Sequence, residues 1–269
     1  MKPLVDTEWL SNNIKSVRVI DATWHLPNSK RIAIDEYKKK HIEGSVYFDI
    51  DLHSDKTSSL PHMMPKKDQW HEIISNFGIN NNDRIIIYDN SDVYSSCRLW
   101  FTFIYFGHDP NLVSVLDGGF LKWISEKRQT VSKMKSFFKT NYIVNEKKNL
   151  IVDKNIIDKN IASPKFDLVD ARSKERFLGK VKEPRDGLKS GSIPKSINLH
   201  YKQCFKKDNT FKNVDELKKI FSSLNLQDNL VFTCGSGITA TIIGLVYSII
   251  YDKRPIIYDG SWSEYGLKK

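Results

Sequence analysis

The sequence has few cysteines and no apolar stretch long enough to cross a membrane. Its three cysteines, Cys97, Cys204 and Cys234, are odd in number and form no C-x-x-C pair. This pattern argues against a disulfide framework and against a structural zinc site. The longest nearly uninterrupted apolar run, residues 238–251, predicts a buried helix because it is too short for a bilayer. The opening residues, MKPLVDTEWL, lack the basic region and apolar core of a secretory signal. We therefore expect a reducing, cytoplasmic location and no membrane partner.

Basic residues exceed acidic ones, but they are not concentrated in one place. The formal net charge is +10, and the lysines stand in short groups at 38–40, 66–67, 147–148, 206–207 and 268–269. A nucleic-acid-binding protein more often gathers its basic residues on one face or in a recognisable motif. We expect a solvated lysine-rich surface with a mild general attraction for anions, and no nucleic-acid partner.

The chain contains an internal repeat. Five segments of the first half return in the same order about 142–151 residues later: 4–14 at 150–161, 17–24 at 166–173, 41–50 at 192–201, 83–92 at 228–237 and 115–123 at 257–265. Asp6 and Asp153 stand in the first of these pairs, each at the expected N-cap of a short helix. Ordered matches of this kind indicate a duplicated domain.

Each half alternates β-rich apolar runs with helical patterns, which predicts an α/β unit around a mainly parallel sheet flanked by helices. We place the first domain at residues 1–130, a polar linker rich in lysine and asparagine at 131–149, and the second domain at 150–269. The repeat sets Asp89 of the first half opposite Cys234 of the second. The asymmetry favours a functional cysteine, because a packing cysteine would more naturally be matched by a small apolar residue.

Cys234 lies in VFTCGSGIT, between a predicted strand and a predicted helix that begins near Thr239. In α/β units such loops are the usual ligand sites. Gly235 and Gly237 permit positive φ and close backbone approach, so the amides of this loop can surround one point. With the helix N-terminus, they can lower a thiol pKa into the range of roughly 3.5–7.5. The alternative is a buried cysteine that packs as a small hydrophobe.

CGSGIT in the second of two similar domains resembles the active-site loop of the 3-mercaptopyruvate sulfurtransferases of the rhodanese superfamily. The resemblance extends over nearly the whole chain and includes HIEGSVYFDID, SDKTSSLPHMMP, RLW, VLDGG, RF…EPRDG and YDGSW. It implies two tandem rhodanese-like domains, of which only the second is catalytic. Thiosulfate-preferring members usually carry a C-R-K-G-V-T loop, and the replacement of its Arg-Lys pair by Gly235 and Ser236 points to 3-mercaptopyruvate.

The resemblance implies a ping-pong reaction with Cys234 as nucleophile. Its thiolate takes sulfur from 3-mercaptopyruvate, releases pyruvate and passes the sulfur to a thiol, such as thioredoxin or glutathione, or to cyanide. No metal and no organic cofactor is expected, because the cysteine persulfide carries the group. The loop residues Gly235, Gly237, Ile238 and Thr239 are then expected to bind substrate. We expect a monomer.

Two arginines are the expected partners of the substrate carboxylate. In the family the arginines of RF and EPRDG hold it, and Arg176 and Arg185 occupy those positions in a stretch that we expect to be a loop. Guanidinium groups bind carboxylates bidentately. The alternative is ordinary ion pairing with Glu175, Glu183 or Asp186.

Three further residues correspond to a proton relay proposed for the family, namely Asp51 of FDID, His62 of HMMP and Ser236 of the cysteine loop. Pyruvate leaves as an enolate that needs a proton, and imidazole can supply one near pH 7. The structural alternatives are a loop histidine between prolines for His62, a turn or cap acceptor for Asp51 and a helix cap for Ser236.

The remaining features are interpreted structurally. Cys97 is expected in a buried helix, Cys204 in a partly polar, exposed segment, and Trp100, Trp123 and Trp262 in the core or at a domain interface. Where the family commonly reads GHIPGS, this chain has GSIPKS, so we expect a locally altered turn at Lys195.

Other functions compete with this interpretation. A cysteine-loop phosphatase needs an arginine six residues after the cysteine, where this chain has Ala240. An inactive rhodanese-like binding module and a thiosulfate sulfurtransferase remain as alternatives, the latter as the runner-up.

Overall fold

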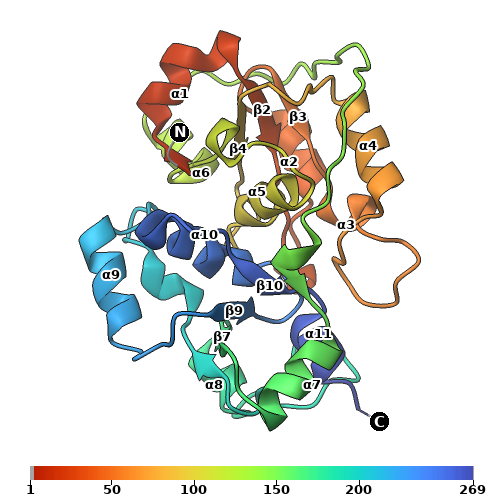
Figure 1. Cartoon of the computed structure of the whole chain (residues 1–269). Coiled ribbons are helices and arrows are strands. Elements are labelled where there is room, and N and C mark those ends of the chain that lie inside the picture. The colour runs from red at the N-terminus through yellow and green to blue at the C-terminus, as the bar shows by residue number, and fades with distance from the viewer. Residues whose placement is uncertain (1–2, 269) are drawn as a thin grey trace. The chain divides into compact units, whose positions relative to one another are not determined.

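The computed structural model of the chain describes residues 3–268 as two α/β units (Figure 1). Unit 1 consists of residues 3–56, 64–147 and 206–211, and unit 2 of residues 57–63, 148–205 and 212–268. Each unit thus includes one short segment from the other half of the sequence. The internal repeat predicts both of these segments, 57–63 and 206–211, within their own halves.

Unit 1 is built on a parallel sheet in the order β1-β5-β4-β2-β3. Its strands are β1 (Leu4–Val5), β2 (Arg18–Asp21), β3 (Ser45–Tyr47), β4 (Ile85–Tyr88) and β5 (Val113–Leu116). Its helices are α1 (Thr7–Asn13), α2 (Ala33–Lys39), α3 (Ile50–His53), α4 (Lys67–Asn76), α5 (Ser96–Tyr105) and α6 (Gly119–Ser125).

Unit 2 repeats this order with a parallel sheet β6-β10-β9-β7-β8. Its strands are β6 (Ile151–Val152), β7 (Asp167–Asp170), β8 (Ile197–Asn198), β9 (Leu230–Thr233) and β10 (Ile256–Tyr258). Its helices are α7 (Lys154–Ala162), α8 (Lys174–Phe177), α9 (Val214–Ser222), α10 (Ala240–Tyr251) and α11 (Ser261–Tyr265). The predicted fold class, two tandem α/β domains with parallel sheets, is confirmed.

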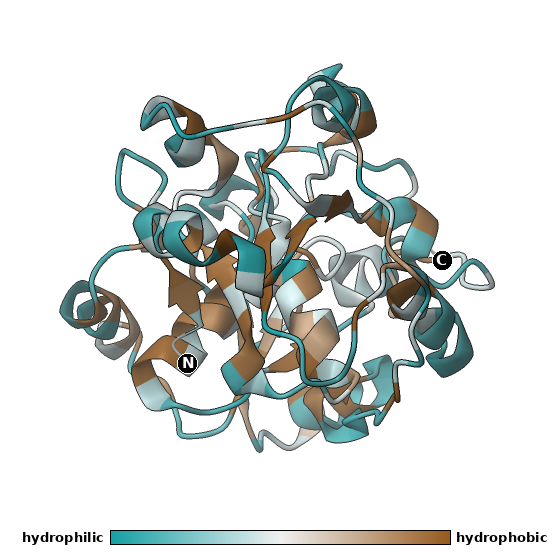
Figure 2. Cartoon of the chain, turned by 90° about the horizontal axis from the view of Figure 1, so that it is seen from above, coloured by the Kyte–Doolittle hydropathy of each residue, from teal (hydrophilic) through white to brown (hydrophobic). Residues whose placement is uncertain are grey.

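Central strands β4 and β9 are buried at every residue, as expected for a parallel sheet covered on both faces. Their sequences, IIIY and LVFT, are rich in residues that suit such strands, and the strand ribbons are largely brown in Figure 2. In unit 1 the strands pack with Leu10, Phe120 and Trp123. In unit 2 they pack with Ile157 and Trp262.

Helix starts follow the predicted signals. Asp6 accepts a hydrogen bond from the backbone N–H of Trp9, and Asp153 accepts the equivalent bond from Ile156, so both act as N-caps as predicted. The apolar run at 238–251 forms α10, which is buried from Ala240 to Tyr247. Within residues 3–268, no helix is both long and apolar enough to cross a membrane.

Candidate functional site

The loop after β9 is fixed by hydrogen bonds to the start of α11. The backbone N–H of Cys234 donates to Ser261 Oγ at 3.2 Å, and the N–H of Trp262 donates to Cys234 O at 3.0 Å. The N–H of Ser263 donates to Gly235 O at 2.8 Å. Gly237 has a φ of +77°, so the loop turns there through the left-handed region before α10 begins. Gly235 does not have a positive φ.

The sheet register bears out the alignment of Asp89 with Cys234. Tyr88 pairs with Asp21 at the end of β4, and Thr233 pairs with Asp170 at the end of β9, so the residues that follow are equivalent. The N–H of Phe120 donates to Asp89 O at 2.8 Å, as that of Trp262 does to Cys234 O.

The Asp89 carboxylate is engaged by its own loop. It accepts hydrogen bonds from the backbone N–H groups of Ser91 (2.9 Å) and Ser96 (2.8 Å), and burial raises its pKa. The loop of unit 1 therefore holds a hydrogen-bonded carboxylate at the position where the loop of unit 2 carries a thiol.

All three cysteines are buried and unpaired with one another, so burial alone does not distinguish Cys234. Cys234 is 2% exposed, whereas Cys97 and Cys204 are fully buried. Cys97 lies on α5, as predicted. The expected exposure of Cys204 is wrong: it ends a 3₁₀ turn over Tyr201–Cys204, and burial raises its pKa to about 12. A thiol with so high a pKa is inert near neutral pH.

His62 and Ser236 meet in unit 2. His62 Nδ1 lies 2.9 Å from Ser236 Oγ, although the two residues are 174 positions apart, because segment 57–63 belongs to this unit. Both side chains are buried, and His62 has a φ of +62°. The alternative for Ser236, a helix cap, is not observed: the N-cap of α10 is Thr239, which makes no side-chain capping bond.

Asp51 lies on α3 in unit 1, where its Oδ2 accepts a hydrogen bond from Trp24 Nε1 at 2.7 Å. It is not the cap of that helix, because the N-cap is Asp49, whose side chain accepts from the Leu52 N–H. The relay of Asp51, His62 and Ser236 stays a prediction.

Arg176 lies on the short helix α8, so the expectation that its whole stretch is a loop is wrong for this residue. Its Nη2 and Nε bind the two carboxylate oxygens of Glu183, at 2.5 and 3.3 Å. The ion pair considered as an alternative is therefore present. The same guanidinium faces the cysteine loop, since a Cβ built on Gly235 would lie 3.0 Å from Arg176 Nη2. Arg185 lies in the loop that follows Glu183 and is half-buried.

Three residues outside the predicted site are linked to it by hydrogen bonds or ion pairs. Arg172 and Glu183 form a buried ion pair at 2.9 Å, and Ser261 accepts from the backbone of Cys234. Signals for Arg172 and Ser261 are present in the sequence, since DARS begins at the last residue of a strand and DGSW recurs as DGGF in the first half. A local sequence does not reveal which buried partner each of these side chains reaches.

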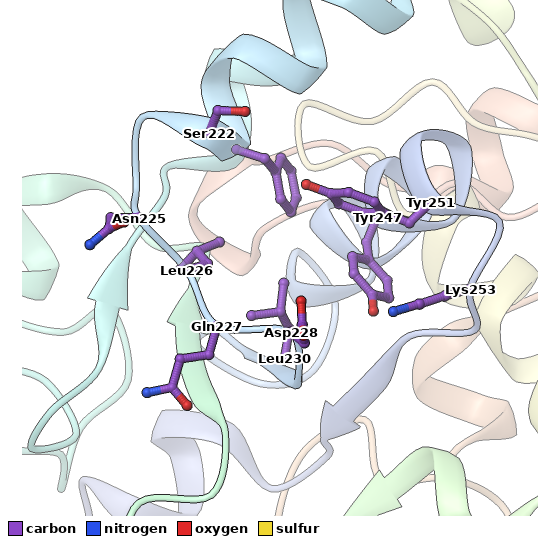
Figure 3. Close-up of a pocket in the computed structure, with 10 residues that line it drawn as sticks. Ser222, Asn225, Leu226, Gln227, Asp228, Leu230, Tyr247, Tyr251 and Lys253 are labelled. Carbon is purple, nitrogen blue, oxygen red and sulfur yellow. The ribbon is translucent and has the colours of Figure 1, made fainter.

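A cavity of about 280 Å³ lies beside the first residue of β9 (Figure 3). Cys234 follows the last residue of that strand. Tyr247 and Tyr251 of α10 line it with Asp228, Leu230 and Lys253. Ligands of parallel sheets bind outside the carboxyl ends of the strands, where Cys234 lies, whereas Leu230 begins β9. We therefore do not assign this cavity to the Cys234 site.

Comparison with known proteins decides the family. The rhodanese-like domain family matches residues 6–126 and again residues 153–268. The chain belongs to the rhodanese family. The rat 3-mercaptopyruvate sulfurtransferase is 34% identical over 99% of this chain and 93% of its own length. The rat thiosulfate sulfurtransferase is also 34% identical, over 98% and 92%.

Similarity to a solved structure supports the same family assignment. The crystal structure of SseA from Escherichia coli, described as a 3-mercaptopyruvate sulfotransferase, matches with a TM-score of 0.87 and 28% identity, over 98% of this chain and 100% of that one. Sulfur transfer is the activity that these similarities support, and they do not separate the two sulfur donors.

Proposed function

We propose that this member of the rhodanese family transfers sulfur from 3-mercaptopyruvate through a persulfide on Cys234. The observation that carries the proposal is the place of Arg176, whose guanidinium lies against Gly235, directly after the nucleophile. A donor that carries a carboxylate can then be held at the cysteine loop by a bidentate ion pair. The rat 3-mercaptopyruvate sulfurtransferase, similar over nearly the whole chain, supports the same donor.

In the proposed reaction the Cys234 thiolate attacks the sulfur of 3-mercaptopyruvate. The new S–S bond forms as the C–S bond breaks, and the electron pair of the C–S bond passes to the carbon, giving the enolate of pyruvate. The proton of the donor thiol ends on this carbon, so the products are pyruvate and a Cys234 persulfide anion. A second thiol or cyanide then takes the outer sulfur and regenerates the thiolate.

The other site residues divide the remaining tasks. Arg176 and Arg185 bind the carboxylate, and the backbone of Gly235, Gly237, Ile238 and Thr239 surrounds the reacting sulfur. The N-terminus of α10 contributes its positive end to the persulfide anion. Two features support this arrangement: the loop turns at Gly237, and Thr239 is the N-cap of α10.

Proton transfer to the enolate is assigned to Ser236 and His62, with Asp51 as a third member. The contact of 2.9 Å between His62 Nδ1 and Ser236 Oγ supports the first two. A positioned acid of this kind typically contributes a factor of about 10²–10⁴ in rate.

The persulfide needs no metal or organic cofactor, and we propose none. The proposed acceptors are small thiols such as glutathione, protein thiols such as thioredoxin, or cyanide. We further propose a monomer without nucleic-acid or membrane partners, and the cytoplasmic location stays a prediction.

A thiosulfate sulfurtransferase is the second candidate, because the rat enzyme of that name is as similar to this chain as the rat 3-mercaptopyruvate enzyme. The Gly235–Ser236 pair favours 3-mercaptopyruvate, since it offers no cationic side chain in the loop to a dianion such as thiosulfate.

The test is the intact mass of the protein after brief exposure to 3-mercaptopyruvate or to thiosulfate, with Cys234→Ser as control. We expect a gain of one sulfur atom from 3-mercaptopyruvate and no gain in the variant. A gain chiefly from thiosulfate would favour the second candidate. A wild-type protein that gains sulfur from neither would be an inactive binding module.

A further inference from the structure

Four charged side chains form a chain of ion pairs beneath the cysteine loop of unit 2. Arg172 Nη2 binds Asp170 at 2.7 Å, Arg172 Nη1 binds Glu183 at 2.9 Å, and Glu183 binds Arg176 at 2.5 Å. The charges alternate in sign. The first three side chains are at most 1% exposed, whereas Arg176 is 26% exposed.

Arg172 is an anchor and not a ligand for substrate. Its guanidinium also donates to the backbone oxygen of Gly191 at 2.9 Å and lies 4.5 Å from the centre of the Trp262 ring. A fully buried guanidinium with these partners cannot turn toward a donor molecule. It can, however, hold the Glu183 carboxylate in one place.

Glu183 in turn fixes the orientation of Arg176. It engages the Nε and Nη2 atoms, which form one edge of the planar guanidinium. Across residues 3–268, Arg176 Nη1 donates no hydrogen bond, so the edge formed by Nη1 and Nη2 remains for another carboxylate. Bidentate recognition needs an edge held in a defined direction.

Gly235 completes the arrangement. A Cβ at this position would lie 3.0 Å from Arg176 Nη2, which is tighter than ordinary van der Waals contact. Its backbone conformation does not require glycine, because its φ is not positive. Lack of a side chain is thus what lets the guanidinium lie against the loop.

We propose that Glu183 is a positioning residue that aims the free edge of Arg176 at the donor carboxylate, in the space that the missing side chain of Gly235 leaves for this guanidinium. The proposal rests on the proposed function insofar as the donor carries a carboxylate. A side chain at position 235 would displace Arg176 and weaken the selection of carboxylate donors.

The test uses alkylation of Cys234 by iodoacetate, which carries a carboxylate, and by iodoacetamide, which does not. The ratio of the two rates, divided by the same ratio for free N-acetylcysteine, measures carboxylate recognition beside the thiol. We expect a normalised ratio above one in the wild type. In Glu183→Gln it should fall roughly tenfold, because the charge-assisted contact that directs Arg176 is lost.

Glu175→Gln is the matched control. It changes the net charge equally and lies on the helix that carries Arg176, but this glutamate is exposed and should leave the ratio unchanged. Gly235→Ala should lower the ratio while Glu183 is intact, because the tethered guanidinium must give way. An unchanged ratio in folded Glu183→Gln, or an equal fall in Glu175→Gln, would overturn the positioning role.

If Glu183→Gln does not fold, Glu183→Asp tests the positioning role in its place. It keeps the charge but is one methylene shorter, so it should draw Arg176 from the loop and lower the ratio; a wild-type ratio contradicts the proposal. This readout is separate from the proposed function. Sulfur loading from 3-mercaptopyruvate with a ratio independent of Glu183 refutes the positioning alone. A ratio dependent on Glu183 without sulfur loading refutes only the proposed donor.

Discussion

Asp21 and Asp170 end equivalent strands and make the same local hydrogen bond, and Asp170 also forms a buried ion pair with Arg172. Each accepts a bond from the backbone N–H two residues later, at 2.9 Å in both cases. The residue there is Thr23 in unit 1 and Arg172 in unit 2. The pKa of Asp21 is raised to about 7, mainly by burial. The nearby Asp89 carboxylate also raises this pKa, whereas the hydrogen bonds from Thr23 lower it.

The raised pKa predicts how the stability contributed by Asp21 depends on pH. The folded state binds the proton more tightly than the unfolded state, whose pKa is near 3.8. Stability is therefore lost as the pH rises from about 4 to about 7, and no more is lost above that range. Asp21→Asn removes this loss, because an amide oxygen can accept the bonds from Thr23.

We expect the stability advantage of Asp21→Asn over the wild type to grow by roughly 3 kcal/mol between pH 5 and pH 8, since one pKa unit is worth about 1.4 kcal/mol. Urea unfolding of both proteins at the two pH values measures it. A difference that is the same at both would mean that Asp21 titrates as in the unfolded chain.

Lys195 occupies a backbone position that favours glycine. Its φ is +63°, and its counterpart in the first half, Gly44, has a φ of +75°. Both halves therefore use the left-handed conformation at this position, and unit 2 accommodates a lysine in it; the turn altered relative to the family stays a prediction. The Lys195 ammonium donates to the backbone oxygen of Ile161 at 2.6 Å on the exposed surface.

Lys195→Gly should stabilise the protein by about 1 kcal/mol, because a side chain in the left-handed region costs about 1–2 kcal/mol and the exposed bond offsets only part of it. Lys195→Ala keeps the strain and loses the bond, so it should not stabilise. Gly44→Ala is the inverse control: no atom lies within 4 Å of the added Cβ, and only backbone strain should appear. Thermal unfolding ranks the variants, and equal melting temperatures for Lys195→Gly and Lys195→Ala would refute the strain.

The hydrogen bonds of Ser261 predict that the start of α11 restricts the mobility of the cysteine loop. Its hydroxyl donates to Tyr258 O at 2.8 Å and accepts from the Cys234 N–H. Ser261→Ala leaves that buried donor without a partner, which typically costs about 1–3 kcal/mol. Ser261→Gly should cost less, because it relieves a φ of +48°, as Gly119 does at the equivalent position with +55°.

Hydrogen exchange of a peptide that covers residues 231–239 is the measurement for Ser261. Both variants should exchange faster than the wild type in this peptide, while a peptide from β4 of unit 1 remains unchanged. Unaltered exchange at 231–239 would show that the bonds from Trp262 and Ser263 suffice to hold the loop.

The proposed proton transfer by His62 and Ser236 predicts that a substitution at Ser236 lowers turnover to different extents with the two sulfur donors. Pyruvate leaves as a basic enolate, whereas sulfite leaves thiosulfate as a stable anion that needs little protonation. Ser236→Ala should therefore lower turnover with 3-mercaptopyruvate by roughly 100-fold, in line with general acid catalysis, and turnover with thiosulfate much less. Equal losses with both donors in steady-state assays would assign Ser236 a role in loop structure instead.

The repeat made most of the fold predictable from the sequence. Five ordered matches imply one architecture used twice, and both sheets have the same strand order. The apolar strands, the Asp6 and Asp153 caps and helix α10 follow from local patterns, because caps and buried strands depend on nearby residues.

The supporting residues of the site were not predictable in this way. Arg172 meets Glu183 only because the backbone between them folds back, and the buried contact is not encoded in either neighbourhood. The polar neighbours of Cys204 suggested exposure, but a single 3₁₀ turn directs the thiol inward while the lysines around it remain in solvent.

The membership of residues 57–63 and 206–211 has a consequence for synthesis on the ribosome. Domains usually complete folding in order as the chain emerges. Here unit 1 needs residues 206–211, where Phe211 donates its N–H to the Asp117 carboxylate and Tyr94 donates to the Asn209 side chain. Unit 1, which is translated first, therefore completes its folding only after most of unit 2 has been synthesised. The two halves of the duplication thus finish folding together.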